Sequence, residues 1–162
     1  MSHLASLLMA DAPLHLEQFL PYRLNVLAET VSQSLSRLYQ KRYGLSIPEW
    51  RVLATLGQYD SMTAKQIGQH SHMHKTKVSR AVTALECRGF IARSVNADDN
   101  RESFLSLTTS GRQTYEAVAP EALAFETALL DTLDTDTRTV LDDLLSSLTE
   151  RAETLASRKD RA

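Results

Sequence analysis

Apolar residues three and four positions apart predict a mostly helical protein, because this spacing places side chains on one face of a helix. The pattern predicts a long helix over residues 14–42, which Pro21 bends or restarts and Gly44 ends. A second helix is predicted to begin after Ser46, which opens a capping-box pattern, and to end at Gly57.

Two shorter helices are predicted next, separated by a three-residue gap. The first covers 64–70 and has Thr63 as its N-cap. The second covers 74–88 and is ended by Gly89. Its apolar residues fall at i, i+3, i+4 and i+7 and predict one buried stripe, made of Val78, Ala81, Val82 and Leu85.

Two strands are predicted after these helices. Residues 90–95 suit a strand, residues 96–100 have the Asn and Asp residues of a turn, and residues 103–107 suit a returning strand with apolar alternation. A helix, a turn, a helix and then a hairpin indicate a winged helix-turn-helix. The predicted fold class is mainly α with a small β-hairpin, a winged helix-turn-helix with N- and C-terminal dimerisation helices.

Two further helices are predicted beyond the hairpin. The first begins near residue 108, and Pro120 inside it predicts a kink or break; Asp134 or Thr135 caps the second. Together with the helix over 14–42, they have more apolar surface than one small winged domain can cover. We therefore expect these helices to bury each other across a two-fold homodimer interface. The alternative is that they fold back on the same chain as a monomeric bundle.

Charge is distributed unevenly along the chain. The formal net charge is −2, yet residues 63–93 contain six Lys or Arg and one acidic residue, whereas residues 108–162 contain six Lys or Arg and eleven acidic residues. Because salt screens charges that lie more than about 10 Å apart, a local basic surface matters more for phosphate attraction than net charge does. The helix over 74–88 carries four basic residues, Lys75, Lys77, Arg80 and Arg88. This distribution favours DNA binding, with the acidic part facing away from DNA.

The predicted domain organisation follows from these elements. Residues 1–13 form a flexible N-terminus, 14–45 and 109–158 form dimerisation helices, and 46–108 form the winged helix-turn-helix DNA-binding region. No apolar run approaches the roughly 18 residues that a membrane-spanning helix requires, so no membrane partner is expected. One cysteine excludes an internal disulfide framework. A cytoplasmic protein is the simplest interpretation.

Six short motifs stand in the order and spacing of a known family. They are LATL at 53–56, TAKQI at 63–67, KTKVSR at 75–80, LECRG at 85–89, NADDNR at 96–101 and LTTSG at 107–111. Over residues 14–156 the chain resembles the MarR (multiple antibiotic resistance regulator) family of bacterial transcription factors. The resemblance implies an obligate homodimer that binds pseudo-palindromic operators in double-stranded DNA. It implies a repressor in most cases, released by a small-molecule effector, with no catalysis and no cofactor.

DNA contacts are expected from the helix over 74–88, the start of the helix before it and the hairpin. Arg80 can bind guanine bidentately, while the lysines neutralise phosphates. Arg101 is the candidate for the minor groove and Asp99 the carboxylate that orients it; the alternative is a surface salt bridge that closes the hairpin. The predicted set is Thr63, Lys65, Lys75, Thr76, Lys77, Ser79, Arg80, Asp99 and Arg101. For Thr63 the alternative is a plain helix cap.

Two positions depart from the family pattern. Many relatives have Asp or Ser where His74 opens the helix over 74–88, which corresponds to the recognition helix of the family. His is a poor N-cap. The sequence therefore predicts a helix start or a first base contact that differs from the relatives'. The predicted turn also has one arginine fewer than many members have, although Asp99 and Arg101 are retained.

The resemblance places an effector pocket between the dimer helices and the winged region. The candidate residues are Tyr22, Arg23, Trp50 and Arg51. Arg23 can pair with a carboxylate, while Trp50 and Arg51 can supply an aromatic wall and a second cation. The alternative places Trp50 in the core and both arginines in surface salt bridges. Residues 21–24 and 47–51 resemble members that control aromatic-acid breakdown, so the expected effector is a small aromatic carboxylate or its coenzyme A thioester.

A second hypothesis is a metal- or redox-sensing regulator on the same scaffold. His70, His72 and His74 suggest a metal, but no cysteine or carboxylate completes a tetrahedral set locally. Cys87 suggests a redox switch, but it lies at a helix C-terminus, where the dipole disfavours a thiolate. No metal site is predicted. An enzyme is not expected either, because the sequence has no Gly-rich phosphate loop, G-x-S-x-G or H-E-x-x-H motif.

Overall fold

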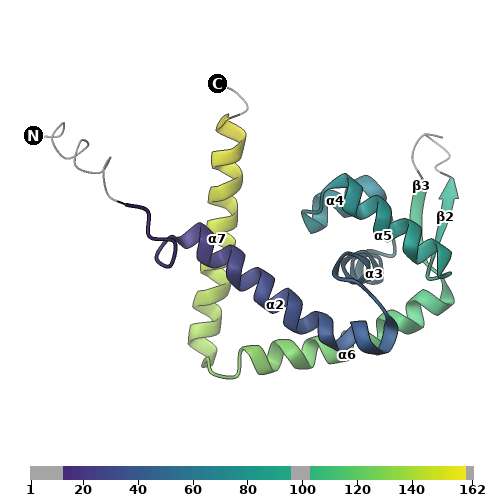
Figure 1. Ribbon diagram of the computed structural model, residues 1–162, viewed down its shortest axis with the longest axis horizontal. Coiled ribbons are helices and arrows are strands. Elements are labelled where there is room, and N and C mark those ends of the chain that lie inside the picture. The colour runs from purple at the N-terminus through teal and green to yellow at the C-terminus, as the bar shows by residue number, and fades with distance from the viewer. Residues whose placement is uncertain (1–12, 96–102, 160–162) are drawn as a thin grey trace, which may run out of the picture. The chain divides into compact units, whose positions relative to one another are not determined.

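The computed structural model describes residues 13–95 and 103–159 (Figure 1). The chain divides into two compact units, Met1–Ala119 and Pro120–Ala162. The first unit contains most of the helices and the sheet, and the second contains the end of one helix and the whole of the last. No helix in the described ranges is long and apolar enough to cross a membrane.

Helix α2 (Leu20–Tyr43) starts later than the sequence predicted. Residues 14–19 lie outside the helix, so the prediction of one helix over 14–42 is wrong at its beginning. They include a turn at 16–18, across which the Phe19 N–H donates to the His15 carbonyl at 3.0 Å. Pro21 explains the difference, because it has no N–H and fits best in the first turn of a helix. Gly44 ends α2 as predicted, with a left-handed φ of 61°.

Helix α3 (Ile47–Tyr59) begins with the predicted capping box. The Ser46 N–H donates to Glu49 Oε2 at 2.7 Å, and the Glu49 N–H donates to Ser46 Oγ at 3.4 Å. The predicted end at Gly57 is wrong, since α3 continues to Tyr59. Gly57 serves packing instead: a Cβ there would lie 2.6 Å from ring atoms of Tyr115.

Helices α4 (Ala64–Ser71) and α5 (Lys75–Cys87) form the predicted helix-turn-helix. The apolar stripe of α5 is buried as predicted and packs toward α3 and α4. Gly89, with a φ of 70°, follows the end of α5. The Phe90 N–H then donates to the Leu85 carbonyl at 2.9 Å, which closes the last turn of the helix.

An antiparallel sheet of three strands follows the order β1-β3-β2. Strands β2 (Ile91–Val95) and β3 (Ser103–Leu107) form the predicted hairpin, with Arg93 opposite Leu105. Strand β1 (Ser61–Thr63) pairs with the other edge of β3 and was not predicted. Three residues are too short to show the alternation by which a strand is recognised. The predicted turn over 96–100 lies outside the described residues.

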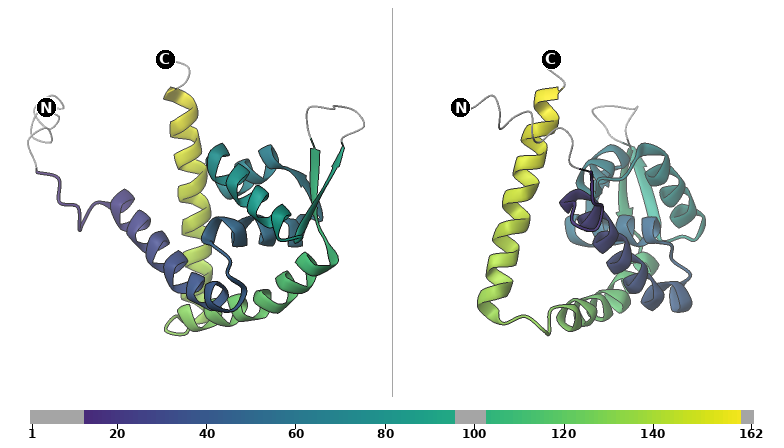
Figure 2. Two further views of the ribbon diagram at one scale, coloured as in Figure 1. Left: turned by 45° about the vertical axis from the view of Figure 1, so that its right-hand side comes forward. Right: turned by 60° about the vertical axis from the view of Figure 1, so that its left-hand side comes forward.

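Helix α3 occupies the centre of the first unit, with α4 and α5 on one side of it (Figures 1 and 2). The largest fully buried side chains come from helices α2 to α5, from α6 (Thr109–Leu129), from β3 and from the segment before α3; they include Tyr39, Leu45, Leu53, Leu56, Ile67, Leu85, Leu105 and Val118. The core therefore holds the helix-turn-helix by its inner face and leaves the outer face of α5 free.

The last two helices are α6 (Thr109–Leu129) and α7 (Thr135–Lys159). α6 remains one helix through Pro120, where the two units divide, so the predicted alternative of a break is wrong. Pro120 cannot donate a backbone hydrogen bond, but the helix continues to Leu129. Asp134 caps α7 as predicted, accepting the Thr137 N–H at 2.8 Å. The hydrogen bonds from Thr137, side chain first and backbone second, lower the pKa of Asp134.

Candidate nucleic-acid interface

The outer face of α5 is a ridge of exposed polar side chains. Residues rotate by about 100° from one to the next on a helix, so Thr76, Arg80 and Thr83 share the side opposite the buried stripe. All three are exposed. The structure thus brings together two predicted DNA contacts, Thr76 and Arg80, with Thr83 as a neighbour. We call these three residues the α5 ridge.

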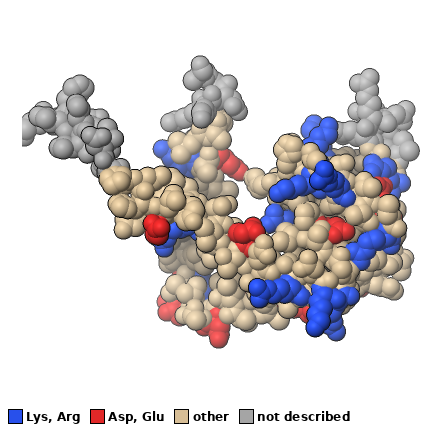
Figure 3. All heavy atoms as spheres, viewed as in Figure 1, with Lys and Arg blue, Asp and Glu red and all other residues tan. Residues whose placement is uncertain are grey.

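The predicted lysines lie on the two flanks of this ridge. Lys77 lies on one flank, and Lys75 and Ser79 lie on the other, where they line a groove of about 650 Å³ between α4 and α5. Lys65 from α4 and Arg93 from β2 line the same groove. In Figure 3, Lys and Arg side chains gather over this part of the first unit. The arrangement suits a phosphate backbone running beside the ridge.

His74 is the N-cap of α5. The Thr76 N–H donates to His74 Nδ1 at 3.4 Å, a long bond that requires the imidazole to be unprotonated at that nitrogen. The helix begins at Lys75, directly after His74. The imidazole thus acts as the N-cap, although the sequence predicted that His would be a poor one. His74 itself is exposed next to the ridge.

Thr63 acts as a cap for α4 through a capping box with Gln66. The Gln66 N–H donates to Thr63 Oγ1 at 3.2 Å, and the Thr63 N–H donates to Gln66 Oε1 at 2.8 Å. The sequence did not predict that Gln66 closes this box. Thr63 is only 5% exposed, whereas Lys65 is exposed in the first turn. Of these two predicted contacts, Lys65 is the side chain free to meet a phosphate.

The hairpin is joined to α5 by an ion pair that the sequence did not predict. Arg93 Nε and Nη2 donate to the two carboxylate oxygens of Glu86 at 2.9 and 3.0 Å. This hydrogen-bonded carboxylate raises the pKa of Arg93. The pair fixes the base of the hairpin against the recognition helix. The predicted minor-groove residues Asp99 and Arg101 lie outside the described residues.

Trp50, one of the candidate effector residues, is in the core. It is 8% exposed and its ring stacks between those of Tyr39 and Tyr115, at centroid distances of 5.5 and 6.3 Å. Burial raises the pKa of Tyr39 to about 12, against a smaller opposing effect of the Arg51 charge. The Trp50 ring on α3 therefore packs against Tyr39 on α2 and Tyr115 on α6.

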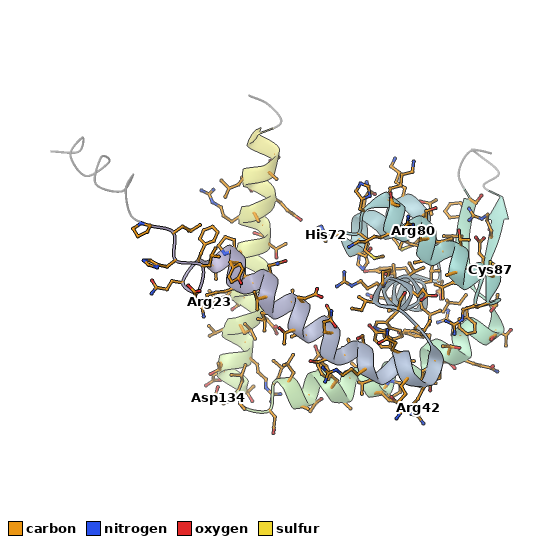
Figure 4. The ribbon with its side chains drawn as sticks, in the orientation of Figure 1. Arg23, Arg42, His72, Arg80, Cys87 and Asp134 are labelled. Carbon is orange, nitrogen blue, oxygen red and sulfur yellow. The ribbon has the colours of Figure 1, made fainter. Side chains whose placement is uncertain are left out.

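The other effector candidates lie apart within the chain. Tyr22 and Arg23 line a shallow depression of about 330 Å³ near the start of α2, where Figure 4 shows Arg23. Arg51 instead donates from Nη2 to Ser32 Oγ at 3.2 Å. Arg23 and Ser32 lie nine positions apart on α2, which corresponds to a rise of about 14 Å along the helix. The structure does not bring these candidates into one pocket of a single chain.

The three histidines each have a separate structural setting. The His70 ring packs edge-on against Tyr59 at 4.9 Å, His72 ends α4 in a left-handed conformation, and His74 caps α5. Across the described ranges no cluster of three or more His, Cys, Asp or Glu could hold a metal ion. Cys87 is an exposed free thiol at the end of α5 nearest the strands (Figure 4). These observations do not favour the metal-sensing hypothesis.

Two short helices, an exposed polar ridge on the second and a flanking antiparallel sheet define a winged helix-turn-helix DNA-binding protein. The sequence model of the MarR family matches residues 45–103. A MarR family transcriptional regulator of known structure from Silicibacter pomeroyi DSS-3 is 31% identical, with a TM-score of 0.68, and covers 84% of this chain and 99% of its own. The chain belongs to the MarR family of DNA-binding transcriptional regulators.

Other relatives agree with this assignment. A helix-turn-helix transcriptional regulator from Bacillus cereus is 28% identical over 123 residues, which are 75% of this chain and 82% of that protein. BpsR of Bordetella bronchiseptica, whose DNA binding is regulated by 6-hydroxynicotinic acid, has the same fold at 18% identity, with a TM-score of 0.75 over 85% of this chain and 98% of its own. The relatives and the fold are those of transcriptional regulators, not of enzymes.

Proposed function

We propose that the chain is a ligand-responsive repressor that binds a pseudo-palindromic operator as a homodimer. The observation that supports this most directly is the exposed α5 ridge with lysines on both flanks, carried by a helix whose opposite face is buried. A helix of this width and chemistry fits a DNA major groove. A DNA partner also supports the proposed cytoplasmic location.

In this proposal the side chains of α5 contact different parts of the DNA. Arg80 binds the O6 and N7 atoms of a guanine, while Thr76 and Ser79 contact neighbouring base edges or phosphates. Lys75 and Lys77 neutralise phosphates on the two sides of the groove, and Lys65 does so from the start of α4. Asp99 and Arg101 would extend the contacts into the minor groove. Thr63 supports Lys65 as the cap of α4.

The homodimer is supported by apolar side chains that the single chain leaves exposed. On α2 they are Leu20, Tyr22, Leu24, Val26 and Leu27. On α7 they are Val140, Leu144, Leu145, Leu148 and Leu155. Exposed apolar residues in this number mark an interaction surface. A two-fold dimer that buries them would present two copies of α5, which read half-sites about one or two helical turns apart in an operator of roughly 16–20 base pairs.

We propose a small aromatic carboxylate, or its coenzyme A thioester, as the effector. The supporting residues are Arg23, exposed beside Tyr22, and Arg51, exposed on α3; an arginine binds a carboxylate bidentately. Since these residues are not adjacent within one chain, the proposed pocket takes groups from both copies of the dimer. Trp50 supports this pocket from the core.

A binding titration tests the DNA-binding part of the proposal. Fluorescence anisotropy with a labelled duplex from the promoter of the chain's own gene is compared with a scrambled duplex of equal length. We expect tighter binding to the promoter duplex, with affinity that falls steeply as salt rises, because phosphate contacts release counterions. Equal affinity for both duplexes at every salt concentration would contradict a sequence-specific regulator.

A thermal-shift screen tests the effector. The probes are benzoate, 4-hydroxybenzoate and benzoyl-coenzyme A, and a ligand that binds only the folded protein raises its melting temperature. We expect one probe to raise it and to lower the affinity for the promoter duplex, and Arg23→Gln to abolish both effects. Arg37→Gln removes a charge from the same helix and serves as the control. A shift that survives Arg23→Gln would remove Arg23 from the proposed pocket.

A further inference from the structure

Arg88 lies where three helices meet at one corner of the first unit. It follows the last residue of α5 and directs its guanidinium away from the α5 ridge. Arg88 Nη1 donates to the Gly44 carbonyl at 3.2 Å, and Nη2 donates to the Tyr43 carbonyl. Nη1 also lies 3.8 Å from Glu49 Oε1. One side chain thus connects the end of α5 with the end of α2 and the start of α3.

The partners of Arg88 are themselves held in place. Gly44 ends α2, and its N–H donates to the Gln40 carbonyl at 3.0 Å. Glu49 is part of the capping box of α3, and its side chain is only 12% exposed. The Arg88 guanidinium also lies 4.6 Å from the centroid of the Phe90 ring, just before β2. The corner therefore gives Arg88 a fixed set of contacts.

The chemistry of this corner requires arginine in particular. The last carbonyls of a helix have no partners within the helix, and the negative end of the helix dipole favours a cation there. A guanidinium presents several N–H groups in a rigid plane, so it can bind two carbonyls and approach a carboxylate at once. A lysine ammonium keeps the charge but cannot reproduce this planar fork.

We propose that Arg88 is a positioning residue for DNA recognition, which fixes the angle of the recognition helix α5 relative to the end of α2. This inference rests on the proposed function, in which α2 carries part of the dimer surface. If α2 forms part of the dimer interface, that interface fixes the position of the end of α2 in each copy of the chain. Arg88 then holds the two recognition helices at the separation that the operator requires, without touching DNA.

This role predicts a particular pattern of loss. A dimer with loosely held recognition helices fits two half-sites poorly but still attracts phosphate, because the exposed Lys65, Lys75 and Lys77 remain. We expect Arg88→Gln to weaken binding to the promoter duplex about tenfold, the equivalent of one lost hydrogen bond to a charged group. Binding to a scrambled duplex, and the salt dependence of that binding, should stay unchanged. Arg88→Lys should restore only part of the specific affinity.

The experiment measures anisotropy with both duplexes for the full chain and its variants. Lys77→Gln is the matched comparison, because a phosphate contact should weaken both duplexes and lower the salt slope by about one. Arg37→Gln, an exposed charge removed from α2, should change neither affinity. Circular dichroism melting confirms that each variant is folded at the binding temperature. If Arg88→Gln does not fold, the affinities of Arg88→Lys for the promoter and scrambled duplexes are compared instead.

Three results would overturn the inference. Unchanged affinity of the folded variant for the promoter duplex would show that Arg88 serves only stability. Equal losses on both duplexes with a reduced salt slope would make Arg88 a phosphate contact. Full rescue by Arg88→Lys would show that charge suffices. Failure of the wild-type chain to prefer its promoter duplex would instead contradict the proposed function, so the two failures are distinguishable.

Discussion

At the scale of single residues, Arg80 and Lys77 should contribute to DNA binding in different ways. Arg80 belongs to the α5 ridge and Lys77 to its flank. We expect Arg80→Ala to lower affinity for the promoter duplex while leaving the scrambled duplex nearly unaffected, since a bidentate guanine contact contributes about 1–3 kcal/mol of discrimination. Lys77→Ala should weaken both duplexes to a similar extent. Anisotropy titrations measure both effects, and identical behaviour of the two variants would contradict this division.

Tyr39 should make stability depend on pH under alkaline conditions. Its pKa is raised to about 12 in the folded protein, above the ordinary value of 10.0, because burial disfavours the phenolate. Between these values the unfolded chain releases a proton that the folded chain retains, so stability present below about pH 10 is lost as the pH rises toward 12.

Urea unfolding between pH 9 and 11 measures this loss. In Tyr39→Phe the same ring packs against Trp50 without an ionisable group, so the decline should be shallower than in the wild type. Parallel declines in both proteins would assign the alkaline sensitivity to other residues.

At the scale of elements, α3 and α6 approach closely because Gly57 has no side chain. In an open helix, replacement of Gly by Ala stabilises by roughly 1 kcal/mol. Here the added Cβ would lie 2.6 Å from the Tyr115 ring, so we expect Gly57→Ala to destabilise by about 1–3 kcal/mol. Urea unfolding measures the change. In a Tyr115→Ala background the same substitution should become neutral or stabilising, and destabilisation in both backgrounds would argue against the steric explanation.

Local chemistry explains which elements the sequence could predict. Ser46 and Thr63 mark helix starts because their hydroxyls accept backbone N–H groups a few residues on, and both caps are present. The buried stripe of α5 was predictable from spacing alone. Strand β1 was not, because its three residues are defined by pairing with β3, distant in the sequence. Gly57 was misread for a similar reason: its neighbour Tyr115 is close only in space.

The candidate site was predictable to the same limited degree. The exposed positions of Thr76 and Arg80 follow from helix geometry, and the structure places both residues on the outer face of α5. The direction of a long side chain at a helix end does not follow from geometry. The sequence places Arg88 among the basic residues of the recognition helix, yet its side chain binds the Tyr43 and Gly44 carbonyls. Its partners lie more than forty positions earlier in the chain.

At the scale of the whole molecule, the proposed homodimer can be tested through α7. Leu148 belongs to its exposed apolar face, and Ser146 lies on the opposite face of the same helix. We expect Leu148→Glu to shift the protein from dimer to monomer and to abolish preferential binding to the promoter duplex, because burial of two charges across a two-fold axis is costly. Sedimentation velocity over a range of concentrations measures the first effect.

Ser146→Glu is the matched control for this prediction. It adds the same charge to the same helix and should leave both the sedimentation coefficient and DNA binding unchanged. A Leu148→Glu protein that remains a dimer would remove this face of α7 from the proposed interface. A wild-type protein that sediments as a monomer would instead favour the monomeric bundle.

The division of α5 into a buried stripe and an outer ridge has a consequence for how such a protein can change. Thr76 and Thr83 are exposed, whereas Val78 and Leu85 are among the buried residues of the same helix. Substitutions at the two threonines therefore alter what the helix can read while the hydrophobic core keeps its contacts. A lineage carrying this scaffold can explore new operator sequences by changing a few exposed positions, with little risk to folding at each step.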